Sequence, residues 1–123
     1  MDREEMLVRT KAFALRIIRL VDAMPQGNVG WVLGKQLIKS GTSIGANDRE
    51  AQRASSRKQF LSTMEIALRE ADETLYWLEL LTDANLFEGN RLTDIENECR
   101  EIVAILTAVV TTTRKSLSTS ANP

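Results

Sequence analysis

Mostly apolar residues recur along this chain at alternating intervals of four and three, and the repeat returns in four separate stretches. The first stretch carries it at Met6, Thr10, Phe13, Ile17, Leu20 and Met24. An average interval of 3.5 residues keeps these side chains on one face of an α-helix, whereas a half-buried strand needs strict alternation. The repeat therefore predicts helices that pack along their apolar faces, and it gives no sign of strands.

The other three stretches cover residues 33–54, 60–81 and 92–113. Polar and turn-forming residues separate the stretches, at residues 25–28, at Ser55-Ser56, and at Asn85 and Gly89-Asn90. Ser56, with Gln59 three positions later, is typical of a capping box that begins the third helix. We predict an all-α protein, an antiparallel up-down-up-down four-helix bundle over residues 1–117, with a disordered polar tail at 118–123.

The amino-acid composition excludes several kinds of chemistry. The chain has no histidine and a single cysteine, Cys99, which lies in the apolar repeat of the last stretch. Without histidine, Ser–His–Asp and Cys–His catalysis and imidazole-based metal sites are excluded. No phosphate-binding glycine loop or nucleophile elbow occurs, and we expect Cys99 to be a buried, inert thiol. We predict that the protein is not an enzyme and has no catalytic residues, metal or cofactor.

The expected location follows from the uncharged runs and from the cysteine count. The longest uncharged runs, residues 23–34 and 102–113, have twelve residues each. A membrane-spanning helix needs about 17–25 apolar residues, and a lone cysteine suits a reducing compartment. We expect a cytoplasmic protein with no membrane partner.

Each predicted helix has more apolar residues than one packed face requires. The third stretch adds Leu61, Leu68, Leu75, Trp77 and Leu80 to its repeat. A small bundle needs about three apolar positions in seven. The surplus can widen the core or form an interface between subunits, and both interpretations stay open.

Gly41 and Gly45 lie inside the predicted second helix. Each interior glycine costs roughly 1 kcal/mol of helix stability relative to alanine. Small residues four positions apart let another helix approach closely, or they leave the backbone open to a partner. We favour close helix packing at Gly41 and Gly45.

The sequence around these glycines is more specific than a helical repeat requires. The segment KSGTSIGAN (39–47) is followed by Glu50-Ala51, by SSRKQF (55–60), and then by Glu70, Glu73 and Tyr76-Trp77-Leu78. Together with Phe13, Arg16, Leu20, Pro25 and Gln36-Leu37, this pattern resembles the bacterial four-helix-bundle proteins encoded in intervening sequences of 23S rRNA genes. The resemblance covers residues 13–81. Relatives often have arginine where Lys39 stands and an apolar residue where Asp48 stands.

The resemblance implies an assembly and a link to RNA. The family is similar in fold to the accessory protein of diversity-generating retroelements, which works with a reverse transcriptase and RNA. Known relatives form rings of bundles, so a ring-shaped homo-oligomer is expected, with a pentamer as the first choice. The expected partners are other copies of this chain, and RNA or an RNA-handling protein. A protein-binding scaffold oligomer without nucleic-acid affinity is the alternative.

Positive charge concentrates near the junction of the second and third helices. Between residues 35 and 58 there are six basic and two acidic residues, although the whole chain has 16 basic and 17 acidic ones. Arg49, Arg53 and Arg57 are spaced by four and can share a helix face. The candidate RNA-binding residues are Lys39, Arg49, Arg53, Arg57 and Lys58. Ordinary pairing with acidic neighbours is the alternative interpretation.

Polar residues on the second and third helices form a second candidate group. Its members are Ser40, Ser43, Asn47, Glu50, Glu70 and Glu73. A di-iron site of the ferritin type would need histidine, and an oxygen-only magnesium site inside a bundle would be unusual. We predict instead that these residues form a polar layer that fixes the register of the helices.

Overall fold

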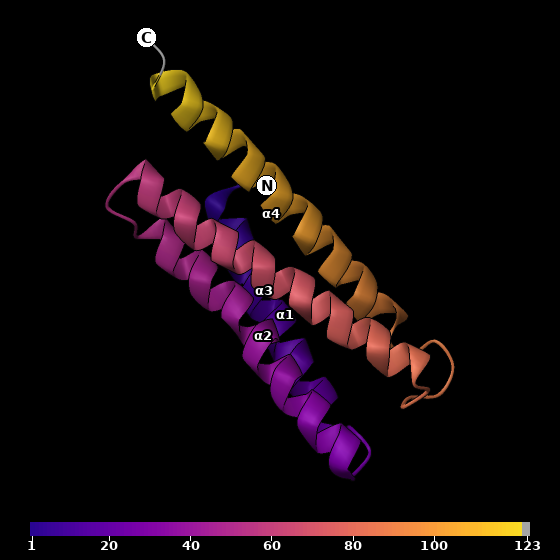
Figure 1. The fold of residues 1–123 in the computed structure, drawn as a ribbon. Helices are drawn as coiled ribbons and strands as arrows, with labels where there is room; N and C mark the ends of the chain where they lie inside the picture. Colours follow the sequence, from indigo (N-terminus) through magenta and orange to yellow (C-terminus); the bar gives the residue numbers. More distant parts are fainter. Residues whose placement is uncertain (122–123) are drawn as a thin grey trace.

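The structure, a computed structural model, describes the chain through residue 121 and its side chains through residue 119. It contains four helices, α1 (Arg3–Asp22), α2 (Asn28–Gln52), α3 (Arg57–Asp83) and α4 (Thr93–Ala121), and residues 1–121 include no strand. Short connections reverse the chain after α1, α2 and α3, so the order is up-down-up-down (Figure 1). The predicted all-α, four-helix architecture is confirmed.

Side chains next to the helix starts bind the free N–H groups of the first turns. Asp2 accepts a hydrogen bond from the N–H of Glu5 at 2.8 Å, and Ser56 Oγ accepts one from the N–H of Gln59 at 3.1 Å. Gln59 Oε1 accepts from the N–H of Ser55 at 2.9 Å. The capping box is therefore present, with its return bond one residue earlier than the standard pattern.

The fourth helix continues past its expected end. We expected a disordered tail from residue 118, but α4 runs to Ala121. The hydroxyl of Thr119 donates to the carbonyl of Lys115 at 2.9 Å, one turn back, so a small polar residue is accommodated within the helix. The last two residues of the expected tail, 122–123, lie outside the described part of the chain.

The apolar repeat identifies the buried face of α1, α3 and most of α4. In α2 the repeat of residues 33–54 placed Leu37, Ser40, Ile44 and Ala51 on the buried face, and all four are buried. It also placed Leu33 and Asn47 there, whereas Gly34 and Asp48, one residue later, are the buried ones. A second series with the same spacing accounts for the additional buried positions, because it shares Leu37, Ile44 and Ala51 with the first and adds Gly34, Gly41 and the polar Asp48.

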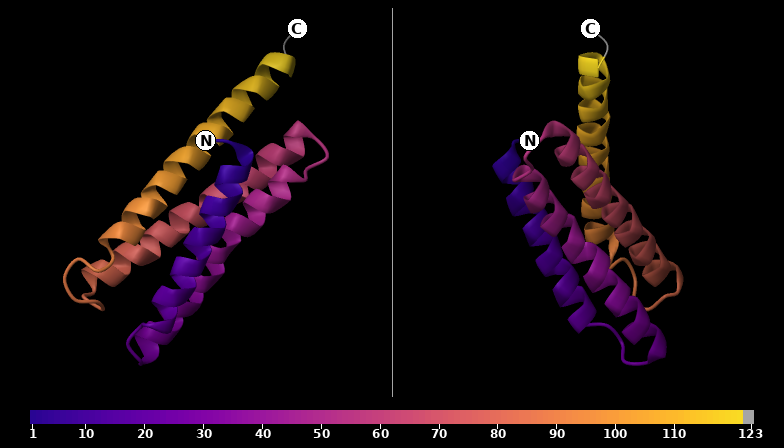
Figure 2. Two further views of the ribbon diagram at one scale, coloured as in Figure 1. Left: turned by 180° about the vertical axis from the view of Figure 1, so that it is seen from behind. Right: turned by 60° about the vertical axis from the view of Figure 1, so that its left-hand side comes forward.

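The fourth helix is packed differently from the other three. It lies along α3, reaches α1 near one end and is inclined to the α1–α2 pair (Figure 2). Arg9 of α1 forms a two-point ion pair with Glu98 of α4, at 2.8 Å from Nε to Oε2 and 2.6 Å from Nη2 to Oε1. Glu101 approaches the same guanidinium at 3.2 Å. This pair holds the pKa of Glu98 below its ordinary value.

Helices α1 and α2 approach each other at three glycines. A Cβ atom at Gly41 would lie 2.9 Å from both Cγ1 and Cγ2 of Ile17, which is fully buried. At Gly34 it would lie 3.0 Å from Cγ1 of Val21, and at Gly45 it would lie 3.3 Å from Oγ1 of Thr10. The small residues of α2 therefore let the side chains of α1 rest against its backbone.

Replacing Gly41 with alanine tests this approach. At an exposed helix position the change would stabilise by roughly 1 kcal/mol, but here the added methyl collides with Ile17. We expect Gly41→Ala to destabilise the protein by about 1–3 kcal/mol, measured by denaturant unfolding. Asp72→Ala, at an exposed position in α3, is the control and should not destabilise. A Gly41→Ala protein as stable as wild type would contradict the close approach.

Candidate functional site

Two hollows follow one another along the surface where α1 meets α2. The first, called here the apolar hollow, lies at the α1–α2 turn and holds about 950 Å³. Its lining includes Ile18, Val21, Met24, Trp31 and Ile38. The second, called here the cationic hollow, lies near the α2–α3 corner and holds about 560 Å³. Its lining includes Lys11, Arg49 and Arg53 above Ala14 and Gly45.

Trp31 dominates the apolar hollow. Its side chain is 66% exposed, and Nζ of Lys35 lies 4.2 Å from the centre of its ring. Further apolar side chains are exposed on the same two helices, namely Val8, Leu15, Ile18, Val29, Val32 and Ile38. Exposed apolar surface gathered on one pair of helices is typical of a protein-binding surface.

The cations of the cationic hollow have no acidic partner. Among residues 1–119, no ion pair reaches Lys11, Arg49 or Arg53. Arg49 and Arg53 also line a smaller hollow of about 320 Å³, together with Gln59 and Glu50. The positive charge at this end of the molecule is therefore open to an anionic partner.

The structure separates the predicted RNA-binding residues. Arg49 and Arg53 lie together, and Lys58 is exposed at the start of α3. Arg57 turns toward α4 and donates to the hydroxyl of Ser116. Lys39 lies ten residues before Arg49, about 15 Å along the helix, and so does not belong to the corner.

Two basic residues at this end were missed by the sequence analysis. Lys11 lines the cationic hollow, and Arg3 lines a neighbouring hollow of about 550 Å³ with Arg57. Both come from α1, which is distant in sequence. The antiparallel order of α1 and α2 was the available signal, because it places the start of α1 beside the end of α2.

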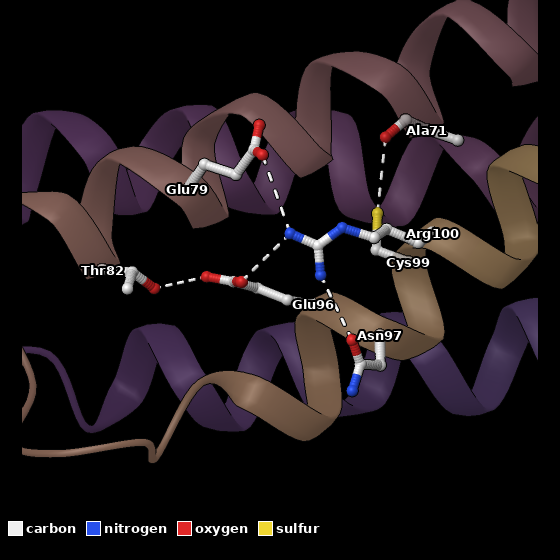
Figure 3. Close-up of polar contacts among 7 residues, drawn as sticks. All are labelled: Ala71, Glu79, Thr82, Glu96, Asn97, Cys99 and Arg100. Carbon is white, nitrogen blue, oxygen red and sulfur yellow. Dashed lines mark hydrogen bonds and ion pairs between the residues drawn. The ribbon is translucent and has the colours of Figure 1, made fainter.

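The opposite end of α3 has a contrasting arrangement of charge (Figure 3). Nη2 of Arg100 lies 3.4 Å from Oε2 of Glu96 and 3.7 Å from Oε2 of Glu79, and Nη1 donates to Asn97 at 3.2 Å. Thr82 donates to the other carboxylate oxygen of Glu96. The cation at this end, Arg100, is therefore paired within the molecule, unlike those of the cationic hollow.

Comparison with known proteins places the chain in a family. Residues 4–108 match the family model described as 23S rRNA-intervening sequence protein. The chain belongs to this family. The resemblance noted from the KSGTSIGAN segment is thereby confirmed, whereas the kinship with the retroelement accessory protein stays a prediction.

One solved structure is similar over almost its whole length. It is the crystal structure of a protein of unknown function from the S23 ribosomal protein family of Bacteroides thetaiotaomicron, with 38% sequence identity and a TM-score of 0.83. The similarity covers 90% of this chain and 99% of that one. No curated protein matches the chain.

In this member of the 23S rRNA-intervening sequence protein family, the polar contact inside the bundle differs from the predicted layer. Ser40 is buried, donates to the carbonyl of Gln36 at 3.0 Å and accepts from the hydroxyl of Thr74 at 2.8 Å. Thr74 lies on α3, so this bond joins α2 to α3. Ser43 and Asn47 instead bond to backbone carbonyls of α2 itself.

The carboxylates expected in the polar layer do not enter it. Glu50 and Glu73 are exposed, and Glu70 is half-buried and contributes its backbone carbonyl, 2.7 Å from the hydroxyl of Thr74. The prediction was wrong because Ala71 and Thr74 occupy the buried positions of this part of α3. Glu73, one residue before Thr74, therefore faces outward.

Within the described part of the chain, no group of three or more Asp, Glu or Cys side chains could hold a metal ion. No helix there is long and apolar enough to cross a membrane.

Cys99 is buried against α3. Its thiol donates to the carbonyl of Ala71 at 3.4 Å (Figure 3), and burial raises its pKa to about 12. A thiol that keeps its proton at physiological pH is a poor nucleophile.

The reactivity of Cys99 can be measured directly. At pH 8 a pKa of about 12 leaves about one thiol in 10⁴ ionised, against about a quarter for a free cysteine. We expect alkylation by iodoacetamide to be at least about 100-fold slower in the native protein than in the urea-unfolded protein. Equal rates would show that the thiol is accessible and ionisable.

Proposed function

We propose that this chain is a non-enzymatic, homo-oligomeric assembly protein of the cytoplasm that associates with RNA. Its copies associate through the apolar hollow, and the assembly presents the cationic hollow to the RNA backbone. One observation carries the proposal: a single α1–α2 surface has an exposed tryptophan at one end and, at the other, three cations that form no ion pair among residues 1–119.

Self-association is supported by the exposed apolar side chains of α1 and α2. Tryptophan is one of the residue types enriched at the energetic centres of interfaces. Trp31 lines a hollow that a side chain of another copy could fill. A hollow on one copy that receives a different surface of the next gives a head-to-tail contact, and such contacts form a ring when the rotation between successive copies closes. A pentamer is the assembly that the family resemblance implies.

Association with RNA is supported by the cations of the cationic hollow, which form no ion pair among residues 1–119. Lys11, Arg49 and Arg53 need not give up an internal ion pair in order to contact a phosphate, so counterion release would favour binding. One subunit offers few charges, but several copies in one assembly would act together. The family is named for sequences that interrupt 23S rRNA, which agrees with a partner of this kind.

A protein-binding scaffold without nucleic-acid affinity is the second candidate. The apolar surface around Trp31 favours it, because that surface can bind any apolar partner regardless of charge. The two candidates differ in their response to salt. Phosphate contacts weaken steeply as salt rises, whereas an apolar interface changes little.

The role of Trp31 in assembly can be tested by charge insertion. We expect wild type to sediment as an oligomer at micromolar concentration and Trp31→Glu to sediment near 13.8 kDa, the mass of one chain. The matched control is Tyr76→Glu, since Tyr76 is also exposed but lies on α3. Wild type at the monomer mass would contradict self-association, and an oligomeric Trp31→Glu would place the interface elsewhere.

The cationic hollow can be tested by charge reversal. We expect wild type to bind structured RNA weakly at low salt, without sequence preference. Arg49→Glu with Arg53→Glu should lower the affinity at least about tenfold and should lower the salt slope by about one unit per lost contact. Fluorescence anisotropy with labelled RNA measures both quantities.

The control for this experiment makes the same change in net charge elsewhere. Arg69→Glu with Arg91→Glu alters two exposed arginines outside the cationic hollow and should bind RNA nearly as well as wild type. Equal losses in both double variants would show a general charge effect. No binding by wild type would favour the protein scaffold.

A further inference from the structure

The carboxyl of Asp48 is buried on α2 without an ionic partner. Its side chain has no exposed surface, although α2 is otherwise polar on both sides of this position. Gln52, one turn later, donates from Nε2 to Oδ1 of Asp48 at 3.0 Å. This hydrogen bond satisfies one atom of each side chain.

The other two oxygen atoms of this pair have no partner. Oδ2 of Asp48 and Oε1 of Gln52 are both buried, and neither has a hydrogen-bond donor among the described residues. An ionised carboxylate can only accept, so it cannot bind the amide oxygen. Two buried acceptors without donors are costly, because each has lost its hydrogen bonds to water.

One proton would satisfy both atoms. A neutral carboxyl has an O–H donor on one oxygen and a free acceptor on the other. A primary amide offers the matching acceptor and donor, so the two groups can form a cyclic pair with two hydrogen bonds. We propose that Asp48 is a buried proton-binding site, with the proton on Oδ2 donated to Oε1 of Gln52.

The surroundings of Asp48 favour this neutral form. Burial is the main influence on the carboxyl and raises its pKa, while the neutral side chains of Gln52 and Thr10 lower it by a smaller amount. The hydroxyl of Thr10, on α1, donates to the carbonyl of Met6 at 3.0 Å. The charged groups on this side are Lys11 of α1 and Arg49 and Arg53 of α2, which line the cationic hollow with Thr10 and Gln52, and none of them is a cause of the shift.

The proton affects both stability and the surface above it. Because the pKa is higher in the folded chain than in the unfolded chain, the contribution of Asp48 to stability is complete below its unfolded pKa, about 4. That contribution is lost as pH rises through the folded pKa. Thr10 and Gln52 also line the cationic hollow. A protonated Asp48 is neutral, so it places no negative charge next to Lys11, Arg49 and Arg53.

Infrared spectroscopy of the wild-type protein tests the site directly. At pH 7 we expect the carbonyl stretch of a protonated carboxylic acid, which should disappear in Asp48→Asn and persist in Asp72→Asn, the exposed control. A wild-type spectrum without this band would overturn the proposal, and so would a band that persists in Asp48→Asn. The wild-type measurement does not depend on whether a variant folds.

Thermal unfolding gives a second readout. Asparagine can form the same two hydrogen bonds with Gln52 at any pH, so Asp48→Asn should unfold at a temperature at least as high as wild type at pH 8. Between pH 5 and 8, the midpoint of wild type should fall relative to that of Asp48→Asn. A variant that is less stable than wild type at pH 8 would show that the carboxylate is ionised and stabilising.

Discussion

The arrangement of the molecule depends on how closely α1 approaches α2. A Cβ atom at Gly41 would lie 2.9 Å from Ile17, so the side chains of α1 rest directly on the backbone of α2. Larger residues would push the helices apart and lose the contacts of the buried Ile17. The glycines are unfavourable for an isolated helix, and the packing that they permit compensates for this cost. The same small residues leave the α1–α2 surface hollow, with Gly34 and Gly45 in the lining of its two sections.

Charge is distributed unevenly over this framework. At the α3–α4 end, Arg100 is surrounded by Glu79, Glu96 and Asn97, and these contacts neutralise it (Figure 3). At the α2–α3 corner Lys11, Arg49 and Arg53 form no ion pair with any side chain of residues 1–119. The net charge of −1 therefore does not show that the cations are paired at one end of the molecule and without ion pairs, among the described residues, at the other. Such a chain can bind an anion locally although its overall charge is slightly negative.

Much of the fold could be predicted from the sequence, because one repeat specifies both the helices and their buried faces. In α2 the repeat identified Leu37, Ser40, Ile44 and Ala51, but small residues satisfy the same spacing one residue further along, so that Asn47 was expected where Asp48 is buried. Helix propensity and residue spacing alone cannot decide which of two such series is buried, because that depends on which side chains of α1 contact α2. The contribution of Lys11 to the cationic hollow and the bond between Thr74 and Ser40 likewise depend on packing between helices.

The proposed use of the α1–α2 surface can be tested most directly by hydroxyl-radical footprinting of its two tryptophans in solution. In a single chain Trp31 is 66% exposed, whereas Trp77 is partly buried in α3. Self-association through the apolar hollow predicts that Trp31 is oxidised no faster than Trp77 in concentrated protein, and that dilution to monomer raises the rate at Trp31 alone. Oxidation of Trp31 ahead of Trp77 at every protein concentration would contradict it.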